Sequence, residues 1–403
     1  MSPREADPYA ALRRGPLALP LAVGAAVTRH GASLHRRRDD LPGALRADLA
    51  GAGRLLSAVG GRSGSRWEPE DVVAELAPGR LVRLHSGGAG VSPVLVVVPQ
   101  GTNPAVLLAG EESVAGALRA EGCAVYAVDW TGPGAGDDVG IEDLIDAIGR
   151  AADHLGGRIH LVGCSQGGWM SAISASLRPS TVASLTLVGA PLTFHVGSPA
   201  AAASGLLALV RRVPPVDVLL RGTVPWWAGW QHAALSGDVW WMVDPVGEAV
   251  RLVRALGAVG GSDGALGDND GALGDDDELG GNDDELTSAA TELGMFSGTP
   301  SMSLQTYLWF AEHLLLDDAF ARGVLEIGGE PADPAAITCP VRLVAGTRDT
   351  LVPLQQVFAA ARVLTGAAAV ERVSVDAGHL ELFTTAAHRW AGPVGDGQGA
   401  GTR

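Results

Sequence analysis

The residues best suited to chemistry lie in the pentapeptide GCSQG at positions 163–167, which has the pattern G-x-S-x-G. A mostly apolar run, 159–162, precedes it, and a helix-compatible stretch follows it. A nucleophile at the apex of a tight strand-to-helix turn sits in strained backbone, so its flanking positions must carry little bulk. The two glycines of the motif meet that need, and Gly168 lets the helix approach the sheet. The pattern predicts Ser165 as a nucleophile at the positive end of a helix.

A serine hydroxyl is a poor nucleophile at neutral pH, so it needs a nearby base and a carboxylate that orients the base. Asp349 follows the strand-like run VRLVAG, and His379 follows the run VERVSVDAG. Sites in parallel α/β sheets form beyond the carboxyl ends of the strands, where both residues are expected. The order serine, acid, histidine is also one in which such triads occur. We therefore predict Ser165 as nucleophile, His379 as general base and Asp349 as the orienting acid.

Other residues compete for two of these roles. Asp376 lies three residues before His379, and Asp129 follows an earlier strand, where its carboxylate could bond the local backbone instead. Asp349 could serve only as the cap of the helix that follows it. A lone histidine in a loop is commonly structural, and the chain has ten histidines in all. The residue pattern alone leaves these alternatives open.

Two backbone amides are expected to form an oxyanion hole. One is the N–H of Gln166, the residue after the predicted nucleophile. The other comes from the loop at 99–103, after the apolar run VLVVVP. Gly101 permits a close approach of the backbone there, and Thr102 is the preferred donor.

The elements that must position these residues alternate between apolar runs and helical patterns. Continuous runs rich in Val and Leu are typical of strands buried on both faces of a parallel sheet. Helical patterns such as EDLIDAIGRAADHL lie between them, so we predict an α/β fold with a mostly parallel, doubly wound sheet. The runs predicted as strands are 81–85, 94–99, 124–130, 159–163, 184–191, 341–346 and 370–378.

The alternation stops between about residues 193 and 336, which indicates a helical cap inserted into the core. A further helical extension is expected before the first strand. The predicted divisions are an N-terminal helical extension at 1–78, the first part of the core at 79–192, the cap insertion at 193–336, the second part of the core at 337–395 and a flexible tail at 396–403.

Two segments of the predicted cap differ sharply in composition. The acidic stretch 256–286 is too rich in Gly, Asp and Asn to repay its ordering entropy, so we predict a disordered surface loop. It lacks the spacing of an EF-hand, and no metal site is predicted. The other segment contains Trp226, Trp227 and Trp230. These rings, with Trp169, could line an acyl pocket, or they could simply pack the cap onto the body.

Composition excludes several classes of protein. The chain has 403 residues and a net charge of −16, which argues against a nucleic-acid partner. Its three cysteines match neither a disulfide framework nor a zinc site, and a reducing cytoplasm is the simplest setting.

Arg13-Arg14 precedes a short apolar stretch like that of an export signal, but two prolines interrupt the stretch. It is also too short to span a membrane.

Four stretches together resemble the polyhydroxyalkanoate depolymerase and synthase group of α/β hydrolases. They are the region 94–130, LVGCSQGG at 161–168, GTRDTLVP at 346–353 and GHLELF at 378–383. The first resembles the family's strand, oxyanion loop and helix, the second its nucleophile motif, and the last two its acid and histidine motifs. The resemblance extends from Leu81 to Phe383, the acidic loop excepted, and implies ester or thioester chemistry on 3-hydroxyacyl chains.

The polymerising members of that group, and some of its intracellular depolymerases, use Cys as the nucleophile, whereas this chain has Ser165 there and Cys164 beside it. A serine acyl-enzyme is typically resolved by water, so the departure favours hydrolysis. We expect an ester hydrolase with no cofactor, acting on a polyhydroxyalkanoate polymer or at its granule surface. The alternatives are a small-ester esterase, an acyltransferase that uses acyl-CoA, and a non-catalytic protein that binds storage granules through its tryptophans.

Overall fold

A computed structural model gives the three-dimensional arrangement of the chain. The structure describes residues 71–88, 92–100, 102, 104–131, 139–196, 302–349 and 351–392. All of them belong to one compact unit, formed by residues 67–236 and 298–403. The tryptophans at 226, 227 and 230, the acidic stretch 256–286, the first 70 residues and the tail 396–403 lie outside the described residues.

An eight-stranded sheet forms the centre of this unit, in the order β1-β2-β4-β3-β5-β6-β9-β10. Strand β2 is antiparallel to both of its neighbours, and every other neighbouring pair is parallel. The predicted mostly parallel α/β sheet is therefore confirmed. Its strands are β1 (Val72–Glu75), β2 (Arg80–His85), β3 (Pro93–Val97), β4 (Ala124–Asp129), β5 (Ile159–Cys164), β6 (Val182–Val188), β9 (Val341–Gly346) and β10 (Val370–Val375).

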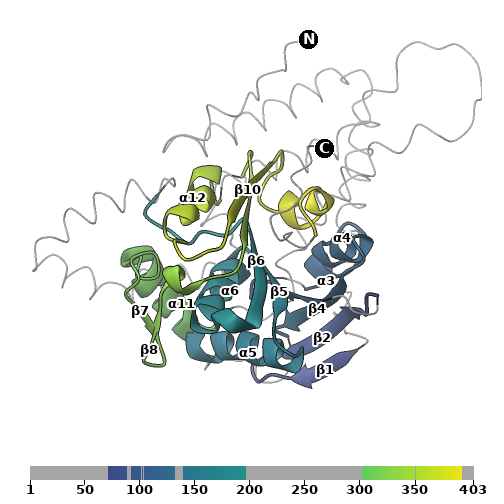
Figure 1. Ribbon diagram of the computed structural model, residues 1–403, viewed down its shortest axis with the longest axis horizontal. Coiled ribbons are helices and arrows are strands. Elements are labelled where there is room, and N and C mark those ends of the chain that lie inside the picture. Colours follow the sequence, from purple (N-terminus) through teal and green to yellow (C-terminus); the bar gives the residue numbers. More distant parts are fainter. Residues whose placement is uncertain are drawn as a thin grey trace, which may run out of the picture. The chain divides into compact units, whose positions relative to one another are not determined.

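The apolar runs found in the sequence form seven of these eight strands. In β3, β5 and β6 almost every residue is buried, so both faces of these central strands are covered. Strand β10 is the edge of the sheet, and its residues are mostly exposed or half-buried. The sequence missed β1, which lies within the predicted helical extension, and a hairpin of β7 (Leu325–Ile327) and β8 (Glu330–Ala332). In Figure 1 the green hairpin is well separated from the purple strands β1 and β2.

Helices pack against the sheet between the strands. Helix α6 contacts β3, β5 and β6. Helix α5 contacts α6 and β3. Helix α4 contacts β4, and α12 contacts β9. The α-helices are α3 (Pro104–Leu108), α4 (Val114–Ala120), α5 (Ile141–His154), α6 (Gln166–Leu177), α11 (Leu304–Phe310) and α12 (Leu354–Ala359). Shorter 3-10 turns are η2 (Pro179–Thr181), η6 (Pro334–Ala336), η7 (Ala360–Arg362), η8 (Glu381–Phe383) and η9 (Ala387–Arg389), and a π-helical turn is η5 (Ala311–Leu316).

Sequence explains the form of individual helices. Helix α5 buries Ile141, Leu144, Ile145 and Ile148, which recur at the spacing of one helical face. Helix α6 is buried almost throughout, because it lies against four strands, β3, β5, β6 and β8, and against α5. No helix within the described ranges combines the length and the hydropathy needed to cross a membrane.

The sheet order brings distant parts of the chain to one edge. Strands β5, β6, β9 and β10 are parallel neighbours, so their carboxyl ends share that edge. Ser165 follows β5, Asp349 follows β9, and His379 follows β10. The fold therefore gathers three polar side chains that are widely separated in the sequence.

Candidate active site

Ser165 occupies the turn between β5 and α6 in a strained backbone conformation. Its φ is +50° and its ψ is −115°, a combination that a residue with a side chain rarely adopts. The Ser165 N–H donates to the Val188 carbonyl at 2.8 Å, and the Ser165 carbonyl accepts from the Gly168 N–H at 2.9 Å. These two bonds hold the turn in place, with the serine at the N-terminus of a 12-residue helix.

Close packing explains the three glycines around the serine. A Cβ at Gly163 would lie 2.5 Å from the Gly168 Cα, and a Cβ at Gly168 would overlap the Ala190 side chain. A Cβ at Gly167 would overlap the carbonyl of Val97 in β3. Any side chain at these positions would force α6 away from the sheet, and Ser165 would move with it.

The structure brings Ser165, His379 and Asp349 into one chain of hydrogen bonds. The Nε2 of His379 lies 3.0 Å from Ser165 Oγ, and its Nδ1 lies 2.7 Å from Asp349 Oδ2. An ionised carboxylate only accepts, so Nδ1 carries a hydrogen and the Nε2 of the neutral ring accepts from the serine hydroxyl. The Asp349 side chain is fully buried, and that of His379 is 10% exposed. This is the geometry in which a histidine can remove the serine proton.

Asp349 is held by its own loop. Its Oδ1 accepts the backbone N–H of Leu351 at 2.9 Å and of Val352 at 2.8 Å. Both bonds are made to the oxygen that faces away from the imidazole, so Oδ2 stays available for His379. The local role that the sequence left open for Asp349 and the contact with His379 therefore coexist in one carboxylate.

The imidazole of His379 is also fixed by packing. A Cβ at Gly189, whose φ is +54°, would lie 3.2 Å from the His379 Cε1. The ring of Phe383 meets the imidazole edge-on, with 5.2 Å between ring centroids. The bare backbone at the end of β6 and an aromatic ring from the histidine's own loop therefore limit how the imidazole can turn.

The two rival acids have other partners. Asp129 is completely buried, and its Oδ2 lies 2.9 Å from the Arg80 Nε. The Asp376 side chain is 80% exposed, and its Oδ1 lies 3.1 Å from the Arg348 Nε. Of the three carboxylates, only Asp349 is hydrogen-bonded to His379 among the contacts of the described residues.

A contact that the sequence did not suggest links Gln166, one predicted oxyanion residue, to the loop that contains Thr102, the other. The side-chain Oε1 of Gln166 accepts the Gln100 N–H at 2.8 Å, which ties the first residue of α6 to the loop after β3. In that loop Thr102 is 5% exposed, and its hydroxyl donates to the Pro99 carbonyl at 2.8 Å. No motif signals the Gln166 side-chain contact, because it joins residues 66 positions apart.

The structure places Trp169 in packing instead of on an open surface. Its side chain is buried, and it stacks on Trp309 and Phe310 with centroid distances of 6.3 and 5.6 Å. Phe194, just after β6, meets Phe310 edge-on at 5.5 Å. These rings join α6 to α11. Trp226, Trp227 and Trp230 lie outside the described residues.

The cysteines are buried, and none forms a disulfide. Burial raises the pKa of the Cys164 thiol far above its ordinary value, so this neighbour of Ser165 stays protonated. Burial likewise raises the pKa of Cys339 to about 11. Among the described residues, no group of three or more His, Cys, Asp or Glu side chains is arranged to hold a metal ion.

Comparison with known proteins supports the fold. A family model described as the alpha/beta hydrolase fold matches residues 93–207, which include β3 to β6 and Ser165. The family match and the sheet order together confirm the α/β-hydrolase fold. No curated protein matches this chain.

Several solved structures are also similar at low identity. An enol-lactonase from Burkholderia xenovorans is 16% identical, with 77% of this chain and 93% of that chain covered and a TM-score of 0.41. A carboxylesterase from Bacillus subtilis is 16% identical, with 84% and 94% covered and a TM-score of 0.40. A carboxylesterase from the thaumarchaeon Nitrososphaera gargenis is 15% identical, with 74% and 87% covered and a TM-score of 0.40.

Proposed function

We propose that this chain, which has the α/β-hydrolase fold, is a serine hydrolase that cleaves carboxylic esters through an acyl-enzyme on Ser165. The observation that supports this most is the continuous contact from Asp349 through His379 to Ser165. Ser165 lies in the strained turn after β5, at the N-terminus of α6.

In the acylation step, Ser165 Oγ attacks the ester carbonyl while His379 Nε2 takes the hydroxyl proton. Asp349 keeps the imidazole in the required tautomer and stabilises the imidazolium that forms. When the tetrahedral intermediate collapses, the imidazolium gives its proton to the departing alcohol. The acyl group then remains on the serine oxygen as an ester.

The negative charge of the intermediate needs preorganised donors. We assign this role to the backbone amides of Gln166 and Thr102. The Gln100 N–H is already bonded to the Gln166 side chain, so it is not the second donor. Removal of one such donor typically slows an enzyme by about 10²- to 10³-fold.

Water completes the reaction, with His379 as the base that activates it. The buried thiol of Cys164 takes no part, because its raised pKa keeps it protonated. The chemistry of this triad needs no cofactor.

Among esters, the resemblance of the nucleophile, acid and histidine motifs favours a polyhydroxyalkanoate polymer. A small-ester esterase is the second candidate, since the same triad serves both substrates.

The test is a panel of p-nitrophenyl esters and amorphous polyhydroxybutyrate, assayed with the wild type and Ser165→Ala. We expect the wild type to release p-nitrophenol and to react with a fluorophosphonate probe, and Ser165→Ala to do neither. Iodoacetamide at pH 8 should leave the activity intact, because Cys164 is buried and protonated. A labelled Ser165→Ala variant, or a wild type inert to every ester and to the probe, would refute the proposed nucleophile.

The same panel separates the substrate classes. Soluble 3-hydroxyacids released from the polymer identify a depolymerase, and activity on p-nitrophenyl esters alone identifies a small-ester esterase. A separate incubation with 3-hydroxybutyryl-CoA tests acyl transfer: growing polymer would identify an acyltransferase and contradict hydrolysis as the main reaction. Binding to polymer granules unaffected by Ser165→Ala, without any reaction, would support the non-catalytic alternative.

A further inference from the structure

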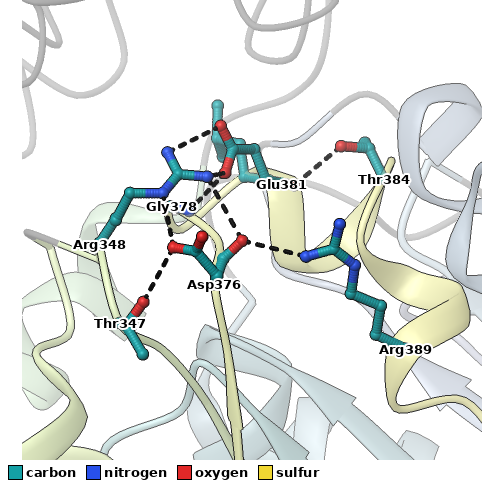
Figure 2. A network of polar contacts seen from close by, with 8 residues as sticks. Thr347, Arg348, Asp376, Gly378, Glu381, Thr384 and Arg389 are labelled. Atoms are coloured by element: carbon teal, nitrogen blue, oxygen red, sulfur yellow. Dashed lines mark hydrogen bonds and ion pairs between the residues drawn. The ribbon is translucent and has the colours of Figure 1, made fainter. Parts of the chain in front are cut away.

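A cluster of polar side chains joins the two loops that provide Asp349 and His379. Arg348 directly precedes Asp349, and Glu381 follows His379 by two residues. The Arg348 guanidinium contacts both carboxylate oxygens of Glu381, with Nη1 at 3.3 Å from Oε1 and Nη2 on Oε2. Its Nε also lies 3.1 Å from Asp376 Oδ1. Figure 2 shows the guanidinium between these two carboxylates, with Gly378 close by.

Glu381 has a second bond inside the histidine loop. Its Oε2 accepts the Gly378 N–H at 2.6 Å, and Gly378 is the residue before His379. One carboxylate therefore receives a backbone donor beside the histidine and a guanidinium beside the acid. Charge-assisted bonds of this kind are shorter and more directional than neutral ones.

The position of the cluster in the fold shows why such a tie is needed. The parallel pairing of β9 and β10 ends at Gly346 and Val375. Beyond that point only two backbone bonds join the loops among the described contacts, Thr347 N–H to the Val375 carbonyl and Arg348 N–H to the Ala377 carbonyl. The Asp349–His379 bond lies farther along both loops, where the sheet no longer sets their separation.

We propose that Arg348 and Glu381 are positioning residues that hold the acid loop and the histidine loop at the separation required by the Asp349–His379 bond. The inference rests on the proposed function. Neither side chain takes part in the chemistry. Arg348 and Glu381 are 38% and 22% exposed, and an ion pair with that much access to water adds little to stability. Its effect is expected in the geometry of the triad, and therefore in kcat.

The same two strands provide a matched control at their other end. Arg342 in β9 and Glu371 in β10 are register partners, and the Arg342 Nε lies 2.8 Å from Glu371 Oε2. This pair also joins β9 to β10 through an arginine and a partly exposed glutamate. It lies at the start of the strands, opposite the edge that holds the triad. Loss of this pair should weaken the strand contact without any effect on the two loops.

The experiment compares Glu381→Ala with Glu371→Ala, each measured for kcat and KM on p-nitrophenyl acetate and for thermal stability. We expect Glu381→Ala to lower kcat about 10-fold, below the ~100-fold that a misplacement of 1 Å can cost. Its KM should stay within about 2-fold, because ground-state binding is not changed. Glu371→Ala should leave kcat within about 2-fold of the wild type at a similar melting temperature.

Glu381→Gln tests the contact between Arg348 and Glu381 with less disturbance of the loop. Glutamine keeps an oxygen for the Gly378 N–H but loses the charge that holds Arg348, so kcat should fall between the wild type and Glu381→Ala. If Glu381→Ala does not fold, this variant decides the question, and a wild-type kcat would overturn the proposal. Arg348→Ala combined with Glu381→Ala should cost less in kcat than the product of the two single effects, because the Arg348–Glu381 contact is lost in both single variants.

The result is separable from that of the proposed function. A wild type without esterase activity or fluorophosphonate labelling refutes the proposed function itself. If the wild type is active and Glu381→Ala has the same kcat as Glu371→Ala, the proposed function stands. The positioning role of Arg348 and Glu381 is then overturned.

Discussion

The ends of β4 and β9 each carry a buried aspartate in the same local arrangement. The Asp129 side chain is completely buried, as is that of Asp349. In both, Oδ1 accepts a backbone N–H from two residues ahead, from Thr131 and from Leu351, each at 2.9 Å. Such Asx turns are a local property of the chain, and nothing in them separates a structural aspartate from a catalytic one.

The difference lies in the partner of the second oxygen. Oδ2 of Asp129 meets Arg80 Nε at 2.9 Å, whereas Oδ2 of Asp349 meets His379 Nδ1 at 2.7 Å. A guanidinium keeps its positive charge under ordinary conditions, so Asp129 is paired with a group that takes no part in proton transfer. An imidazole can take up and release a proton, so the contact of Asp349 with His379 suits the orienting role that we propose for Asp349. The two aspartates therefore differ in the partner that the fold supplies to Oδ2, and not in their local turns.

The largest expected effect is at Asp349. Asp349→Asn keeps an oxygen for the Leu351 N–H but offers the imidazole no charge, so His379 loses the stabilisation of its protonated form. We expect kcat on p-nitrophenyl esters to fall by about 10⁴-fold, with the fold retained. If kcat falls by less than about 10-fold in Asp349→Asn, Asp349 is not the orienting acid.

The next effect is on stability, at Asp129. Asp129→Asn leaves the Arg80 guanidinium without its ion-pair partner, and removing one member of a buried pair is costly. Because Arg80 is 21% exposed and keeps some water, we expect a loss of about 2 kcal/mol in the free energy of unfolding. Urea denaturation measures it, and kcat per folded molecule should remain near that of the wild type.

A control for Asp129→Asn is Asp376→Asn, because Asp376 is the exposed rival acid. The Asp376 side chain is 80% exposed, so its change should stay within about 0.5 kcal/mol. If Asp129→Asn abolishes activity while the protein stays folded, the contrast between the two strand ends is wrong.

The smallest effect is expected at Asp318, a third buried carboxylate. Its Oδ1 accepts the Phe194 N–H at 2.9 Å, and its φ is +49°, a conformation that asparagine tolerates. Burial raises the pKa of Asp318 in the folded protein. Folding therefore disfavours the ionised carboxylate of Asp318. The resulting loss in the free energy of unfolding grows as pH rises from the pKa in the unfolded chain, about 3.9, through the raised pKa in the folded protein.

Asp318→Asn keeps the acceptor and removes that charge. Its stability relative to the wild type should therefore increase as pH rises above about 4, and the two proteins should converge at lower pH. Melting temperatures measured between pH 4 and pH 7.5 test this. A difference that is constant over the range, or that favours the wild type more at higher pH, would contradict a raised pKa.

The central strands and the turn that holds Ser165 could be predicted from the order of the residues alone. Continuous apolar runs were sufficient for β3, β5 and β6, because strands covered on both faces have no polar side to interrupt them. The turn was predictable because its steric demands are local, and glycine is required on both sides of the serine. The short β1 and the β7–β8 hairpin have no such pattern and were missed.

Which side chains meet could not be predicted in the same way, because it depends on the three-dimensional fold. Ser165 and His379 are 214 positions apart, and the register of a parallel sheet sets whether they touch. Asp129, Asp349 and Asp376 were equivalent as residue types at strand ends, and the sheet order gave each a different partner. The physical reason is that hydrogen bonds act over about 3 Å, while the strands that align these groups are placed by the packing of the whole core.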